Sequence, residues 1–464
     1  MALPKIDIGL TRSERLPAIL LVILFVALCA AGGASRDDVL AQAVIRGFAV
    51  MAMFVQVVAG RAPELSRYRA CSWLLGAMVA VAALQLVPLP PQIWTALPGR
   101  GLIASSPLGG EGWRPMNLVP DAGWNSLFSL LVPLSVLVLL SSLENRTVRR
   151  VQYLLIAVVL FSALLALLQA AGSAPENPLI NGSTDDYGGM FANRNHQAVF
   201  LAIGIVVAWF WGFQRGGHWR DRRLWLAVCV VLLLSVSILV TGSRTGVILG
   251  GVAIMAGPFL ARPRRGKPAA RKTGIALWIG ISLIIAVGVL LLSSYFGRAA
   301  SLNRATTLNL DADFRLRALP TVLEIAKTYF PFGAGLGSFD PVFRSAEPFA
   351  LLEPTYFNHA HNDLLETVIE TGIFGPIILL TALIWLFRRM IVMFSESGEN
   401  ARMGRLGALI VGLVVVASVS DYPVRTPMFM VIMMVAGCWL TGSSPNRSEP
   451  DAAGSALPSS GKFL

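Results

Sequence analysis

Long apolar stretches alternate with short polar stretches along the whole chain. Many of the apolar runs hold roughly 17–25 residues, which is long enough for an α-helix to cross a hydrocarbon core about 30 Å thick. The pattern therefore predicts an all-α polytopic membrane protein of about 12 transmembrane helices. The expected spans are 16–33, 43–60, 72–89, 126–143, 151–172, 196–214, 224–241, 245–261, 273–292, 367–387, 406–421 and 427–441.

Composition excludes a water-soluble globule, because 55% of the 464 residues are hydrophobic and only 14% are charged, against about 25% charged in soluble domains. The first apolar run ends in small residues (27–35) and resembles a signal peptide. We interpret it as the first helix, since eleven further spans follow. The four cysteines (Cys29, Cys71, Cys229 and Cys438) fall in or beside predicted helices, so no disulfide framework is expected.

The distribution of basic residues predicts the orientation of the chain. Segments 61–69, 146–150, 215–223, 262–272 and 388–405 carry most of the arginine and lysine, and such short basic links stay in the cytoplasm. This assignment predicts a multi-pass protein of the bacterial inner membrane with both termini cytoplasmic. The net charge of +12 is then explained by topology, and no nucleic-acid partner is expected.

The same assignment divides the chain into six parts. They are a cytoplasmic N-terminus (1–15), helices one to five with their loops (16–195), helices six to nine (196–292), a large periplasmic loop (293–366), helices ten to twelve (367–441) and a disordered cytoplasmic tail (442–464). A loop as long as 293–366 is usually functional. It contains His359 and His361, and a helix expected over 311–330. The expected apolar face of this helix, lying along the membrane surface, is Phe314, Leu316, Leu319, Leu323, Ile325 and Tyr329.

Two shorter outside segments are also candidates for chemistry. Segment 181–196 ends in Asn-Arg-Asn-His and is either a binding turn or a solvated turn in which Asn195 caps the next helix. Segment 241–246 places Arg244 at the outer membrane boundary, where it either binds an anion or serves as an interface anchor.

Taken in order, these motifs resemble the O-antigen ligase and O-antigen polymerase superfamily. They are the run 191–196, the run 243–246, Arg315 ahead of the glycine-rich run 331–339, and the run 359–363 followed by 372–375. The most specific element is His-Asn, nine residues, Gly, two residues and Gly. One departure is Ile248, where the ligase pattern has leucine. The resemblance implies a GT-C-like, metal-independent membrane glycosyltransferase without a cofactor.

The resemblance further implies transfer of a glycan from undecaprenyl diphosphate to a glycan or lipid acceptor on the periplasmic face. Arg244 and Arg315 would bind the diphosphate, since guanidinium groups stabilise a departing phosphate. His361 would be the general base, because its ordinary pKa suits proton transfer near neutral pH. The supporting or substrate-contacting residues would be Asn193, Arg194, Asn195, Asn362, Asp363 and Glu366.

Several alternatives remain open. Ligase, polysaccharide polymerase and protein O-oligosaccharyltransferase share these motifs. A secondary transporter would place ionisable groups or broken helices near the membrane middle, whereas the predicted spans are nearly free of charge. A structural partner in an envelope assembly is a third class. A metal-dependent enzyme would use carboxylate pairs such as Asp37–Asp38 or Asp185–Asp186.

Overall fold

The computed structural model describes residues 10–36, 39–106, 112–173, 177–180, 187–214, 221–260, 288, 314–352, 357–396 and 398–441. Within these ranges eight helices are long and apolar enough to cross a membrane, and three shorter apolar helices accompany them. The polytopic all-α class is therefore confirmed, and eleven of the expected spans have a helical counterpart. The expected span 273–292 lies outside the described residues.

Within the described ranges, eleven helices or pairs of continuous helices correspond to expected spans. They are α1 (Arg15–Ala31), α2 (Leu40–Ala59), η1 (Leu65–Tyr68) continued by α3 (Arg69–Gln85), α6 (Pro120–Ser129) continued by α7 (Leu131–Ser141), α8 (Asn145–Ala170), α9 (Arg194–Phe213), α10 (Arg222–Thr241), α11 (Arg244–Leu260), α17 (Phe374–Ser395), α18 (Glu399–Ala417) and α19 (Pro427–Thr441).

Two expected boundaries are wrong for local reasons. The third span ends at Gln85 rather than 89, because β1 (Pro88–Leu89) pairs with β2 (Arg114–Pro115) in an antiparallel ladder. The tenth span begins at Phe374, seven residues later than expected, because a separate helix, α16 (Asp363–Thr371), comes first. Gly372 separates the two with φ 58°, and a Cβ there would lie 1.9 Å from the Pro331 carbonyl oxygen. Only glycine fits this break.

Helix α9 forms the centre of the helical body and is buried over 94% of its apolar window. It packs against α8, α10, α11 and α18. Its sequence is apolar on every side after the first turn, which is the pattern of a helix surrounded by protein. The N-terminus of α9, which carries Asn193 to His196, is therefore held firmly in place.

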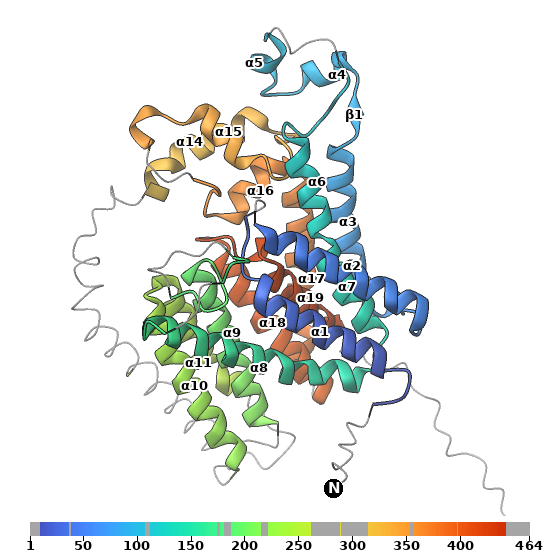
Figure 1. Cartoon of the computed structure of the whole chain (residues 1–464), viewed down its shortest axis with the longest axis vertical. Coiled ribbons are helices and arrows are strands. Elements are labelled where there is room, and N and C mark those ends of the chain that lie inside the picture. Colours follow the sequence, from blue (N-terminus) through green and yellow to red (C-terminus); the bar gives the residue numbers. More distant parts are fainter. Residues whose placement is uncertain are drawn as a thin grey trace, which may run out of the picture.

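A cap of short elements lies beyond one end of the long helices (Figure 1). It consists of α4 (Pro91–Ala96), α5 (Gly101–Ala104), the β1–β2 ladder, α14 (Phe314–Tyr329), α15 (Phe339–Ala346), η3 (Phe349–Leu351) and α16. Buried Arg100 joins two parts of the cap by donating to the carbonyls of Met116 and Gly333. Gln85 joins the cap to the helical body, since it donates to the Glu370 carbonyl and accepts from Leu336 N–H.

Helix α14 confirms the expected helix but not its expected apolar face. Ala318, Val322 and Ile325 are buried with residues of α15 and α16 in a second hydrophobic cluster. The expected face is thus split, because Ile325 is buried whereas Leu316 and Leu319 are exposed. The helix packs on the cap through one side and presents leucines on another.

Candidate functional site

The polar link 418–426 between α18 and α19, called here the α18–α19 link, contacts side chains from several other segments. Its centre is Asp421, whose side chain is 2% exposed. One oxygen, Oδ2, accepts a hydrogen bond of 2.8 Å from Asn195. The other, Oδ1, lies 3.6 Å from Nε2 of His196 and 3.5 Å from Nδ1 of His361. A single carboxylate therefore joins the start of α9 to the histidine segment before α16.

The electrostatics of this centre favour an ionised aspartate. Burial by itself would raise the pKa of Asp421, but the neighbouring imidazoles of His196 and His361 outweigh it and hold the pKa well below its usual range. For His361, burial is the largest influence and lowers the pKa. Asp421 opposes that effect, and the positive charge of Arg315 adds to it. The imidazole of His361 is thus neutral at pH 7 and able to accept a proton.

The segment 357–362 holds the two outer histidines in a fixed conformation. His361 has φ 50°, an uncommon backbone region for a non-glycine residue. Asn362 caps α16, since its side-chain oxygen accepts from Leu364 N–H and Leu365 N–H. Nδ1 of His359 lies 2.7 Å from Glu366 Oε1, and Glu366 Oε2 accepts from Ala360 N–H. Each histidine therefore has its own carboxylate partner.

Arg425 links the same helix to the α18–α19 link through three carboxylates. Its guanidinium group lies 3.3 Å from Asp363 and 3.2 Å from both Glu366 and Glu370. Burial would raise the pKa of Glu366, yet Arg425 and His359 lower it to about 2. Burial keeps the pKa of Asp363 and Glu370 raised despite Arg425. The carboxylates in turn raise the pKa of Arg425, so it remains charged.

The two arginines expected at the diphosphate flank the same link. Arg315, in the first turn of α14, donates from Nη1 to the Ser420 carbonyl at 3.1 Å. Arg244 is the first residue of α11, and its side chain is exposed. The next residue, Thr245, lies 3.4 Å from the Ser420 hydroxyl, measured between their side-chain oxygens. The two helix starts therefore meet at Ser420, next to Asp421.

The contacts of the other expected supporting residues show what each of them does in the structure. Asn193 caps α9 by accepting from Asn195 N–H, so the cap is Asn193 rather than Asn195. Arg194 begins α9 and is half-buried. Of the expected supporting residues that carry a carboxylate, Glu366 contacts His359 and Asp363 contacts Arg425.

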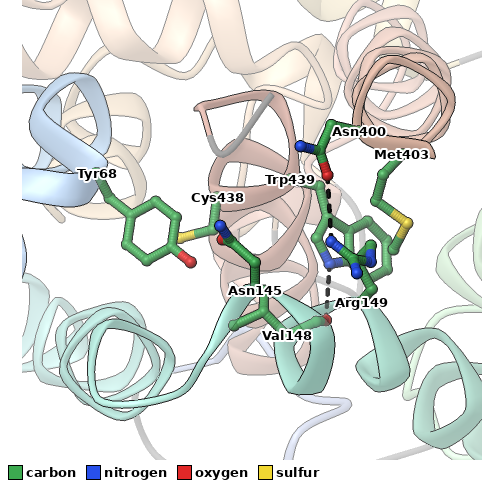
Figure 2. Close-up of a pocket in the computed structure, with 8 residues that line it drawn as sticks. All are labelled: Tyr68, Asn145, Val148, Arg149, Asn400, Met403, Cys438 and Trp439. Atoms are coloured by element: carbon green, nitrogen blue, oxygen red, sulfur yellow. Dashed lines mark hydrogen bonds between the residues drawn. The ribbon is translucent and has the colours of Figure 1, made fainter. Parts of the chain in front are cut away.

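A cavity of about 140 Å³ adjoins this centre. The link between α1 and α2 lines one side of it. The start of α9, including His196, lines the other side, and Tyr422 also contributes. Figure 2 shows a different hollow, at the opposite end of the helices, where Arg149 donates to Asn400 and Trp439 donates to the Val148 carbonyl. That second hollow contains no titratable pair of histidine and carboxylate.

Across the described part of the chain, no group of three or more histidine, cysteine or carboxylate side chains has the arrangement of a metal site. The carboxylate pairs Asp37–Asp38 and Asp185–Asp186 lie outside the described residues. Metal independence therefore stays a prediction.

Sequence reasoning missed Asp421, Tyr422 and Arg425, which organise the site. The ring of Tyr422 lies 4.2 Å from that of His359, 4.9 Å from that of His361 and 5.1 Å from that of His196, between centroids. A signal was present, since Arg425 is a basic residue in a short link assigned to the outside, against the usual charge distribution. Asp421 was included in an expected span that in fact ends at Ala417.

Comparison with known proteins confirms the resemblance to the O-antigen ligase superfamily. A family model described as O-antigen ligase matches residues 229–380. The chain is also similar to the exopolysaccharide production protein ExoQ of Rhizobium meliloti (strain 1021), with 28% identity over 258 residues. That match covers 54% of this chain and 56% of the relative, so the chain spans about half the length of this curated relative. The family match includes Arg244, Arg315 and His361 but ends before Asp421.

Proposed function

We propose that this chain is a metal-independent glycosyltransferase of the bacterial inner membrane. It transfers a glycan from undecaprenyl diphosphate to an acceptor hydroxyl on the periplasmic face. The observation that carries the proposal is the pairing of His361 with buried Asp421, beside Arg315 and the start of α11. The similarity to an exopolysaccharide production protein favours an exopolysaccharide over a lipopolysaccharide as the product.

Departure of the diphosphate is assigned to the arginine side of the site. Negative charge develops on the bridging oxygen as the glycosidic bond breaks, and preorganised guanidinium groups stabilise it. Arg315 is held by the Ser420 carbonyl, which fixes part of its position in advance. Arg244 lies at the start of α11, where the helix dipole adds positive potential. The two arginines thereby replace the cation that other phosphate chemistry requires.

Activation of the acceptor is assigned to His361. Nδ1 faces Asp421, so Nε2 is the nitrogen that takes the proton of the attacking hydroxyl. Ionised Asp421 stabilises the imidazolium that forms, in the way a carboxylate supports histidine in acyl-transfer sites. The bond from the acceptor oxygen to the anomeric carbon forms as the bond to the diphosphate oxygen breaks.

Orientation follows the positive-inside rule. Several arginines form hydrogen bonds at the ends of the helices away from the cap, among them Arg67, Arg149 and Arg402. We assign that side to the cytoplasm. The cap and the candidate site then face the periplasm, where polymerised glycans are assembled from lipid-linked donors.

The test is glycan transfer in membranes from a producing strain, with protein levels matched between variants. His361→Ala should lower the transfer rate by about 10²–10⁴-fold, which is the usual contribution of a general base. His359→Ala is the matched control. It should cost less, because His359 pairs with Glu366 rather than with the centre at Asp421. Chelation with EDTA should leave the wild-type rate unchanged. An active His361→Ala enzyme, or loss of activity in EDTA restored by magnesium, would refute the proposal.

A further inference from the structure

Asp421 lies between two imidazoles, and the proposed mechanism uses only one of them. Oδ1 of Asp421 is 3.5 Å from Nδ1 of His361 and 3.6 Å from Nε2 of His196. His361 faces this oxygen from the segment before α16, whereas His196 faces it from the first turn of α9. The oxygen that supports the proposed base is therefore shared with a second histidine, which takes no proton in the proposed mechanism.

The backbone of His196 is fixed by the way α9 begins. Asn193 caps the helix by accepting from Asn195 N–H, and Ala192 N–H donates to the Gly33 carbonyl. The helix that follows is buried over 94% of its apolar window. Side chains on a packed helix are held more precisely than side chains on loops. His196 can therefore serve as a fixed point for the α18–α19 link.

The surroundings of the His196 ring are aromatic and do not require its nitrogens. The ring packs edge-on against Tyr422, Phe429 and Phe191, with centroids 5.1, 6.1 and 6.4 Å away. The side chain is 1% exposed, and burial of two polar ring nitrogens costs free energy that an apolar ring avoids. Packing alone would favour phenylalanine here. A polar role is needed to explain the imidazole.

The carboxylate of Asp421 determines that Nε2 of His196 carries a hydrogen. A bare nitrogen lone pair facing ionised Oδ1 would be repelled, whereas an N–H is attracted. Nε2 then carries the hydrogen in the neutral ring as well as in the charged one. The separation of 3.6 Å is longer than an ordinary hydrogen bond. Such contacts are often long in substrate-free enzymes and shorten in the reacting complex.

Donors reach both oxygens of Asp421. Asn195 donates to Oδ2 at 2.8 Å, and Tyr422 N–H donates to Oδ1 at 3.0 Å. Tyr422 is the next residue of the same link, so its N–H moves with Asp421 and cannot hold the link against α9. The contacts that fix the carboxylate relative to the helical body therefore come from the start of α9.

The contacts from α9 differ in the oxygen they reach. Asn195 donates to Oδ2, and Asn193 lies 3.4 and 3.5 Å from the two oxygens and does not distinguish them. His196 is directed at Oδ1, the oxygen that faces His361. Of these contacts, the one from His196 is thus the one that can set the direction of the oxygen used by the base.

We infer that His196 is a positioning residue, which holds Oδ1 of Asp421 toward Nδ1 of His361. The inference rests on the proposed function, in which His361 is the base. His196 acts through Asp421 and does not touch the reacting atoms. Its effect on the rate can still be large, because a misplacement of about 1 Å in a supporting group can cost about 10²-fold.

Two substitutions separate positioning from packing. His196→Gln keeps an N–H donor at about the reach of Nε2, whereas His196→Phe keeps the ring shape and removes the donor. Glycan transfer is measured in membranes from a producing strain at matched protein levels. His196→Phe should lower the rate by about 10²-fold, and His196→Gln should be at least roughly tenfold faster than His196→Phe. Unfolding temperatures in detergent should rank the other way, because phenylalanine suits the aromatic surroundings.

Asp421→Ala tests whether His196 acts through this carboxylate. Combined with it, His196→Gln and His196→Phe should differ in rate by less than about twofold, because their shared partner is gone. If His196→Phe transfers at least as fast as His196→Gln while Asp421 is present, His196 is a packing residue and the inference is refuted. A roughly tenfold advantage of His196→Gln that persists with Asp421→Ala also refutes it. His361→Ala in the same membranes tests the proposed function separately, since activity there would remove the base whatever the result at His196.

Discussion

Two arginines at the end of the membrane helices away from the cap differ in their partners from Arg425 at the cap end. At the end away from the cap, Arg389 donates to the Leu440 carbonyl and Arg402 to the Phe213 carbonyl. These carbonyls lie in the last turns of α19 and α9, which arginine commonly satisfies. At the cap end, Arg425 instead faces three carboxylates. The first arrangement completes helix ends, whereas the second gathers titratable groups that are costly to bury.

The difference supports the proposed location of the site at the cap end. A buried ion network gives weak stabilisation relative to apolar packing, because desolvation of the charges offsets their attraction. A helix end needs only its carbonyls satisfied. The network of carboxylates and histidines at the cap end therefore contains more buried charge than stability of the fold requires. The ring of Tyr422 connects it to the proposed base His361, because that ring contacts both His359 and His361.

The largest expected effect comes from removing the cation at the cap end. Arg425→Met leaves Glu366 and Glu370 buried without the cation that neutralises them, and loss of one member of such a network costs about 3–5 kcal/mol of unfolding free energy. Arg402→Met is the matched change at the other end. It removes bonds to carbonyls and should cost about 1–3 kcal/mol. Thermal unfolding in detergent measures both, and equal losses would show that the two ends are built alike.

A second expected effect concerns pH and distinguishes the site from a purely structural network. The activity should fall as pH decreases through the pKa of His361, which burial holds below its ordinary value. Asp421 raises that pKa by its negative charge close to Nδ1, so Asp421→Asn should move the acid limb of the rate profile to lower pH. The maximal rate should also fall, because the imidazolium loses its stabilising charge. An unchanged acid limb would mean that another group is titrating.

Part of this picture could be predicted from the sequence, because it depends on local pattern. The apolar runs identified eleven helices of the described chain, and the His-Asn-Gly-Gly spacing identified His361. The contacts of Asp421 could not be predicted in that way. Asp421 is 226 positions from Asn195 and 60 positions from His361 along the chain. No local pattern in any of these segments indicates that they meet. Such pairing is set by the packing of α9 and α18.

The role of Glu366 shows the same limit on a smaller scale. It lies five residues after His361, and the sequence resemblance makes it a supporting or substrate-contacting residue. The positive φ of His361 turns the chain just before α16, and His359 rather than His361 meets the carboxylate. Spacing along the sequence does not determine which side chains meet when the backbone leaves the regular regions.

The smallest expected effect tests whether every polar group at the cap end is functional. Asn362 follows His361 directly, yet its side-chain oxygen is used to cap α16. Asn362→Ala should therefore cost about 1 kcal/mol of stability, as loss of an N-cap usually does. Asn362→Ser keeps a capping oxygen but removes the amide, so unfolding temperature and transfer rate should both remain near wild type. If Asn362→Ser is as stable as wild type but transfers glycan poorly, the amide contacts substrate. The comparison between a structural end and a functional end would then extend to this residue as well.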